Sequence, residues 1–337
     1  MALFGRRNVM LAMLVFAAVA PAFLNAYYLF VANTILIYVL LSIGLNILVG
    51  YTGQLAFANA AMFGIGAYGT GLLQVHFGWP FWLAFPSGAL IATAVGLAIS
   101  LPALRLRGLY LALSTLAFAQ FTQWVFLNWE AVTFGAGGFK TPPISFAPLP
   151  ISKPFGLYYL SLILVLALFV LAQNLVQSRI GRAFVAVRDS DIAAESLGID
   201  LLRYKALAFG ISGFYAGIAG GLYSAMLNFV SPEGYDLFQM VIQKAMIIVG
   251  GLGSVAGSVL GAGSLVFILE ALRKVKGAQE IVFGAILVGF ILFMPGGIIG
   301  FLKDKVRGWE EPLNRARHGK LPLLSPTTAA ESREVRP

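Results

Sequence analysis

The chain has 337 residues, of which 59% are hydrophobic and only 11% carry a charge, and its formal net charge is +9. Soluble domains carry roughly a quarter charged residues, so this composition excludes an ordinary water-soluble fold and indicates a protein solvated mostly by lipid. The sequence contains no cysteine and two histidines, which excludes disulfides and thiolate metal sites and leaves little material for a histidine-based centre. We therefore expect no metal, no cofactor and no enzymatic activity.

Charges, prolines and polar clusters divide the chain into about ten apolar segments, most of them close to the roughly 20 residues needed to cross a bilayer core. Residues 8–104 contain no Asp, Glu, Lys or Arg and read as the first four segments. The predicted segments are 9–24, 27–49, 55–75, 79–104, 108–129, 155–176, 206–230, 237–252, 253–269 and 281–302. The sequence thus predicts an all-α, polytopic membrane helix bundle with about ten transmembrane segments, or roughly eight if the short eighth and ninth do not both cross.

The first segment has two interpretations. Arg6 and Arg7 precede an apolar run, as they would in a secretory signal. A first membrane span anchored by two arginines explains the same pattern, and we favour it because another apolar segment begins at residue 27.

Basic residues fall in alternate loops. Seventeen of the 23 Lys and Arg residues lie before the first segment, in the loops at 105–107 and 178–205, and after residue 302. Because cytoplasmic loops carry an excess of Lys and Arg, an even number of crossings with both termini in the cytoplasm is predicted. Arg273, Lys274 and Lys276 would then lie outside, and a re-entrant hairpin at 237–252 is a possible variant. We expect a transmembrane domain over 1–302 and a polar, partly disordered cytoplasmic tail over 303–337.

Residues 50–68 combine glycines with buried amides in a charge-free segment. Tyr51, Thr52, Gln54 and Asn59 would line a translocation path if this segment is a broken helix. Alternatively, Gly64 and Gly66 serve close helix packing and Asn59 makes an interhelical hydrogen bond. The two interpretations are compatible.

The loop at 178–205 contains a predicted short helix within 189–200. Ser190 or Asp189 would cap its start, and Gly198 would end it. Small alanines with charged edges suit docking into a groove of a partner protein, and an ordinary solvated loop is the alternative.

A glycine-rich run occupies residues 249–263. Gly253, Gly257 and Gly261 recur every four residues, which would place them on one helix face for close packing, and Gly250 and Gly251 precede them. No Lys-Ser or Lys-Thr follows, so the run is not a phosphate-binding loop.

Lys244 and Glu270 are the ionisable residues inside predicted spans. Such groups usually pair with each other or line a path. Three interpretations remain open: a Lys244–Glu270 ion pair, a Lys244 that faces an anionic group of the substrate, or two residues near the membrane interface.

Several motifs together resemble the branched-chain amino acid ABC transporter permeases, in particular the LivM-type subunit. Gly50-Tyr-Thr-Gly-Gln-Leu-Ala-Phe and Gly64-Ile-Gly-Ala-Tyr are similar to the family signature. Further similarities, in the expected order, are Ser114-Thr-Leu-Ala-Phe, Asn128-Trp, Gly181-Arg-Ala-Phe-Val-Ala-Val-Arg-Asp, Ala193-Ala-Glu-Ser-Leu-Gly-Ile, Ser231-Pro and Gly250-Gly-Leu-Gly-Ser. They cover about residues 40 to 300.

The resemblance implies one permease of an importer in the bacterial inner membrane. Its partners would be two ATP-binding subunits, a homologous second permease and a periplasmic solute-binding protein, with no nucleic acid. It also implies that the short helix couples to the ATPase. The residues assigned to that role are Arg182, Arg188, Asp189, Asp191, Ala193, Ala194, Glu195 and Gly198.

The chain departs from the family pattern at Ile192, where a Glu is usual, and at Lys244, where an apolar residue is usual. These departures bear on the solute, since related systems import amides or urea, more than on the fold. An ion-coupled secondary transporter or channel without ATPase partners is the alternative function. A membrane scaffold is a weaker one.

Overall fold

The structure is a computed structural model that describes residues 25–103, 108–146, 152–273, 279–294 and 296–305, together with Pro21 and Leu106. It is almost entirely helical. The long helices are α2 (Ala26–Asn46), α3 (Asn59–Phe77), α4 (Phe81–Ala103), α5 (Leu109–Asn128), α7 (Lys153–Gln177), α10 (Leu201–Leu227), α11 (Leu237–Gly250), α12 (Val255–Leu272) and α13 (Gln279–Phe293). The shorter elements are the π-helical turn η2 (Ile47–Tyr51), α6 (Glu130–Thr133), η3 (Gly135–Gly137), β1 (Phe139–Lys140), α8 (Arg179–Asp189), α9 (Asp191–Ser196), β2 (Phe229–Val230), η4 (Pro232–Tyr235) and α14 (Gly297–Lys305).

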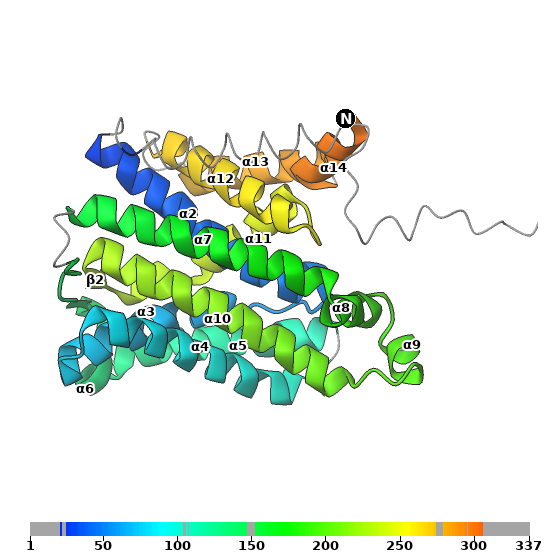
Figure 1. Ribbon diagram of the computed structural model, residues 1–337, viewed down its shortest axis with the longest axis horizontal. Coiled ribbons are helices and arrows are strands. Elements are labelled where there is room, and N and C mark those ends of the chain that lie inside the picture. The colour runs from blue at the N-terminus through cyan, green and yellow to red at the C-terminus, as the bar shows by residue number, and fades with distance from the viewer. Residues whose placement is uncertain are drawn as a thin grey trace, which may run out of the picture. The chain divides into compact units, whose positions relative to one another are not determined.

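Helix α10 packs along α2, α3 and α4, and α2 also packs against α7 and α12. Figure 1 shows the pair α8 and α9 at one end of this bundle, while β2 lies at the opposite end. There β1 and β2 form a two-residue antiparallel ladder in which Phe139 pairs with Val230. The chain between the predicted segments 108–129 and 155–176 therefore contains regular structure, namely α6, η3 and β1, in its described part.

Close approach of α3, α4 and α10 depends on glycine. A Cβ atom at Gly66 would meet the backbone of Gly217 in α10, and one at Gly88 in α4 would meet Thr70 in α3. A Cβ at Gly64 would meet the rings of Phe126 and Tyr235. Without glycine at these positions the helices would have to separate, as expected where small residues mediate packing in lipid.

Six helices of the described chain are long and apolar enough to cross a bilayer: Ala26–Tyr51, Phe81–Pro102, Leu109–Asn128, Lys153–Gln177, Leu201–Leu227 and Val255–Leu272. Six of the ten predicted segments correspond to these six helices, the ninth, 253–269, among them, and α10 begins five residues earlier than expected. The predicted segment 9–24 and the tail 306–337 lie outside the described residues. The predicted segment 281–302 is divided between α13, which ends at Phe293, and α14, which begins at Gly297 with a left-handed φ of 68°.

The predicted eighth and ninth segments form a helical hairpin. Helix α11 has 14 residues and is therefore only about 21 Å long, which is short of the roughly 30 Å of a bilayer core. A Cβ at Gly250 in α11 would meet Gly257 and Gly261 in α12, so these glycines hold the two helices together. The expectation that Gly253 shares a helix face with them is wrong. Gly251 and Gly253 have positive φ values of 118° and 72° and make the turn between α11 and α12.

Candidate functional site

The helix break expected in residues 50–68 is present. After η2 the chain is non-helical until α3 begins at Asn59. Gly53 has a φ of 71°, a conformation that favours glycine, and a Cβ at Gly50 would meet Asn46 and the backbone of Gly253. The freed backbone is satisfied locally, since the Thr52 hydroxyl donates to the Ile47 carbonyl at 2.8 Å.

Three of the predicted path residues are buried in or beside this break. Tyr51 ends η2, and Thr52 follows it with no exposed surface. The Gln54 amide donates to the Thr52 carbonyl at 3.2 Å. These side chains stabilise the irregular backbone, which membrane proteins tolerate where protein buries it.

Asn46 connects the break to the α11–α12 hairpin. Its Nδ2 donates to the Ser254 carbonyl and to Ser258 Oγ, both at 2.8 Å, and its Oδ1 accepts from the Gly253 N–H at 2.9 Å. The sequence analysis missed this residue. Its signal was an asparagine, one of two in the apolar segment 27–49, because an amide in a membrane must find partners.

The short helix predicted in 189–200 is α9, which is shorter than the predicted range. Ser190 caps it by accepting from the Ala193 N–H at 3.2 Å. Gly198, with a φ of 79°, ends it, and its N–H donates to the Glu195 carbonyl at 2.9 Å. Ser190 rather than Asp189 is thus the cap.

One face of the α9 segment is exposed and partly apolar. Ile192 is 74% exposed and Leu197 is 78% exposed, whereas Ala194 is buried against the rest of the protein. Ala193 and Glu195 are also exposed. Ile192 and Leu197 are thus two large apolar side chains that the α9 segment leaves exposed.

An ion pair fixes α9 to the start of α10. Lys205 Nζ lies 2.7 Å from Asp191 Oδ2, and only 6% of the Lys205 side chain is exposed. Lys205 could not be singled out from the sequence, because it is one of five basic residues in the loop at 178–205 and its charge does not distinguish it from the other four.

Arg188 joins this region to the helix break. Its Nη1 donates to the Gly50 carbonyl at 3.0 Å, and its guanidinium also binds Asp189 at 3.1 Å. A Cβ at Gly53 would meet Arg188. Arg182, in contrast, is exposed and donates to the Gln177 carbonyl at 3.3 Å.

A polar pocket of about 280 Å³ lies where the two motifs meet. Its lining includes Thr52, Gly53 and Gln54 from the break, and Arg188, Asp191 and Lys205 from the α8–α10 region. Segments more than 130 residues apart in the sequence therefore share one pocket.

A second polar group lies inside the bundle. Asn59 Nδ2 donates to Gln243 Oε1 at 3.1 Å, and the Ser212 hydroxyl donates to Asn59 Oδ1 at 2.9 Å. Asn59 thus joins α3 to both α11 and α10, as the packing interpretation of this residue expected.

The ion pair considered between Lys244 and Glu270 is absent from the described residues, so that interpretation is wrong. Lys244 Nζ donates to the Ala56 carbonyl and lies 5.0 Å from the centroid of the Phe57 ring. Glu270 accepts from the Tyr27 hydroxyl and lies 3.4 Å from Arg273. The two residues are on different helices of the α11–α12 hairpin, and Glu270 is near the end of α12 remote from the break.

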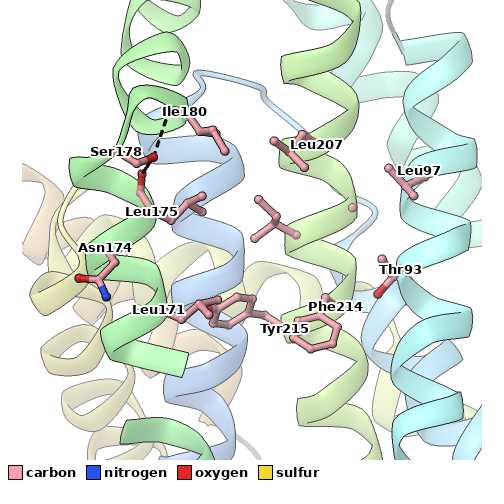
Figure 2. A pocket seen from close by; sticks show the side chains of 12 residues that line it. Thr93, Leu97, Leu171, Asn174, Leu175, Ser178, Ile180, Leu207, Phe214 and Tyr215 are labelled. Atoms are coloured by element: carbon pink, nitrogen blue, oxygen red, sulfur yellow. Dashed lines mark hydrogen bonds between the residues drawn. The ribbon is translucent and has the colours of Figure 1, made fainter. Parts of the chain in front are cut away.

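Another hollow is largely apolar and is not part of this site. Figure 2 shows it between α4, α7 and α10, with Leu97, Leu171, Leu207 and Phe214 among its lining residues. None of the predicted path or coupling residues lines it. Among the described residues no group of His, Asp and Glu side chains is arranged to hold a metal ion.

Comparison with known proteins identifies the family. Residues 27–294 match the family described as branched-chain amino acid transport system / permease component. The high-affinity branched-chain amino acid transport system permease protein LivM of Salmonella typhimurium is 31% identical, over 88% of this chain and 76% of that relative. Permease protein LivH of Escherichia coli from the same type of system is 28% identical, over 78% of this chain and 91% of that relative.

A more distant similarity is to the autoinducer 2 import system permease protein LsrC of Yersinia pseudotuberculosis, which is 28% identical over 45% of this chain and 43% of that relative. No solved structure matches the chain.

Proposed function

Because the chain belongs to the family of branched-chain amino acid transport permeases and is a multi-pass membrane protein, we propose that it imports branched-chain amino acids or related small solutes, such as amides or urea, across the bacterial inner membrane. It is a permease subunit of an ATP-binding cassette importer. Two ATP-binding subunits, a homologous second permease and a periplasmic binding protein complete the proposed assembly. ATP hydrolysis belongs to the partner subunits, and the permease itself changes no covalent bond.

The observation that carries the mechanism is the shared pocket between the helix break and the α8–α9 region. We propose that the ATPase contacts the exposed face of α9 through Ile192 and Leu197. Closure of the ATPase dimer would displace α9. The displacement would reach α10 through the Asp191–Lys205 pair and the break through the Arg188–Gly50 hydrogen bond.

Alternating access follows from this arrangement. The break at 52–58 is irregular backbone held by a few hydrogen bonds, so it can rearrange at lower cost than a continuous helix. A change of α9 position that favours one arrangement of the break would shift the population between outward-open and inward-open states. Tyr51, Thr52, Gln54 and Asn59 are the proposed path residues in this segment.

The proposed topology has ten segments with both termini in the cytoplasm and a cytoplasmic tail from residue 303. The described helices support it, because the α8–α9 end carries the basic loop at 178–205, which the distribution of Lys and Arg assigns to the cytoplasm. The short helix α11 would enter the membrane packed against α12, whereas α13 has exposed apolar side chains such as Val288 and Leu292.

The ion-coupled alternative has little support. Glu270, the acid that it required, is bound to Tyr27 and Arg273 at the end of α12 rather than placed along the break.

Reconstitution tests the proposed function. The chain is placed in liposomes with its second permease and ATPases, and uptake of radiolabelled L-leucine is measured with loaded binding protein. We expect uptake that requires ATP and ceases when the ATPases are left out. Uptake by the permease chain alone, driven by an ion gradient, would contradict the proposal.

A further inference from the structure

Two neighbouring side chains of α11 face the start of α3. Gln243 is 1% exposed, and its Oε1 accepts from Asn59, the first residue of α3. Lys244 Nζ donates to the carbonyl of Ala56, three residues earlier. Both residues therefore lie against the non-helical segment that leads into α3.

Beside this non-helical segment, the polar groups that could make a further hydrogen bond or ion pair are donors. Gln243 Nε2 is buried and has no acceptor among the described residues. Lys244 has no carboxylate within ion-pair distance in the described part of the chain. A buried donor without a partner destabilises the folded protein, and an unpaired cation in a membrane span does so more strongly. A buried polar group without a partner in a native protein calls for an explanation, and the simplest explanation is a bound ligand that supplies the acceptor.

The start of α3 adds to this positive potential. Helix α3 has 19 residues, and no side chain caps its first turn, because Ala58 occupies the N-cap position. The N–H groups and dipole at a helix start attract anions. The Phe57 ring, 5.0 Å from Lys244 Nζ, favours an ammonium at this position over its displacement into lipid.

We infer that Lys244, the Gln243 amide and the first turn of α3 form a subsite for the carboxylate of an amino acid in transit. The inference rests on the proposed function, which makes this segment part of the translocation path. An ammonium and an amide donor match the two oxygens of one carboxylate. An apolar cluster that includes Ala60, Ala61 and Met240 borders the same turn and matches an aliphatic side chain.

Ligand binding to the permease–ATPase complex, without the binding protein, tests the subsite. Radiolabelled L-leucine is the probe, and the variants are Lys244→Met and Lys244→Arg, with Lys140→Met as a control that removes an exposed cation from β1. Loss of one charge-assisted hydrogen bond should weaken binding about tenfold or more in Lys244→Met. Lys244→Arg should retain most of the affinity, and Lys140→Met should equal wild type.

Competition identifies the recognised group without any variant, which covers the case that Lys244→Met fails to assemble. 4-Methylpentanoate keeps the carboxylate and the carbon skeleton of leucine, whereas isoamylamine keeps the amine. We expect the first to displace L-leucine and the second to have little effect. The opposite order would overturn the subsite.

Uptake separates the two proposals and replaces the binding assay if affinity in detergent is below detection. With saturating binding protein, Lys244→Met should import at least about tenfold less leucine per ATP than wild type. Equal ratios in the two proteins would overturn the carboxylate subsite and leave the proposed function intact. A wild-type complex that imports no amino acid would contradict the proposed function itself.

Discussion

Arg188 donates a hydrogen bond from Nη1 to the carbonyl oxygen of Gly50 at 3.0 Å, which joins helix α8 to the turn that follows α2. This contact links the segment proposed to meet the ATPase with the segment proposed to line the path. Gly50 itself touches the α11–α12 turn, because a Cβ there would meet the backbone N of Gly253. A displacement of α8 would thus reach two elements of the bundle.

Removing the Arg188 side chain should uncouple ATP hydrolysis from transport. In Arg188→Ala we expect leucine imported per ATP to fall about tenfold, which corresponds to the loss of one charge-assisted hydrogen bond. The measurement is uptake and ATPase activity in the same proteoliposomes. Arg203→Ala is the matched control, since Arg203 is an exposed arginine paired with Asp200 in its own turn. Equal ratios in Arg188→Ala and wild type would remove this contact from the mechanism.

Breaking the Asp191–Lys205 pair should destabilise the α9 region. Lys205→Met leaves Asp191 without its buried cationic partner, at a cost of about 3 kcal/mol. We expect lower thermal stability in detergent and faster proteolysis in residues 190–200. The double variant Lys205→Met with Asp191→Asn should lose less than the sum of the two single losses. Additive losses would show that the pair is not coupled.

Asn46 should matter far more to stability than Asn33, although both are buried amides of α2. Asn46→Leu leaves the Gly253 N–H without its acceptor and removes the hydrogen bonds from Asn46 Nδ2 to the Ser254 carbonyl and to Ser258 Oγ, with an expected cost of about 2–3 kcal/mol. Asn33 donates to the Leu29 carbonyl in its own helix, and its Oδ1 has no partner among the described residues, so Asn33→Leu should change stability little. Thermal unfolding of both variants makes the comparison. Similar losses would contradict the role of Asn46 as a link.

Gly66→Ala should destabilise the bundle, because the new methyl group would meet the backbone of Gly217. Overpacking of this kind costs roughly 1–3 kcal/mol. Gly284→Ala in α13 is the control, since a Cβ there meets nothing within 4 Å in the described part of the chain, and alanine favours a helix. Thermal unfolding should therefore place Gly284→Ala at or above wild type and Gly66→Ala below it.

The sequence predicted features that local chemistry determines. Gly50 and Gly53 in a charge-free segment indicated the break, and Ser190 and Gly198 indicated the ends of α9. It did not reveal features that depend on distant partners. Asn46 and Lys205 acquire their roles from Ser254 and Asp191, which no local pattern connects to them.

The difference between local and distant determinants also explains the two predictions that were wrong. Lys244 and Glu270 carry opposite charges, which suggested an ion pair. The turn at Gly251 and Gly253 reverses the chain, so Glu270 lies near the end of α12 that is remote from the break. The glycine period of four placed Gly253 on a helix, although its positive φ ends helical structure there.

The most direct test of the coupling mechanism is a cross-link between α9 and the ATPase. The natural sequence has no cysteine, so Leu197→Cys introduces a single reactive thiol on the exposed face of α9, and Phe77→Cys places one in an exposed position at the end of α3, towards β1. In the assembled importer, we predict that a short thiol-to-amine cross-linker joins the Leu197→Cys chain, but not the Phe77→Cys chain, to the ATP-binding subunit, and that ATP changes the yield. An active complex in which the Leu197→Cys chain forms no cross-link to the ATPase, or in which the Phe77→Cys chain does, would contradict the account.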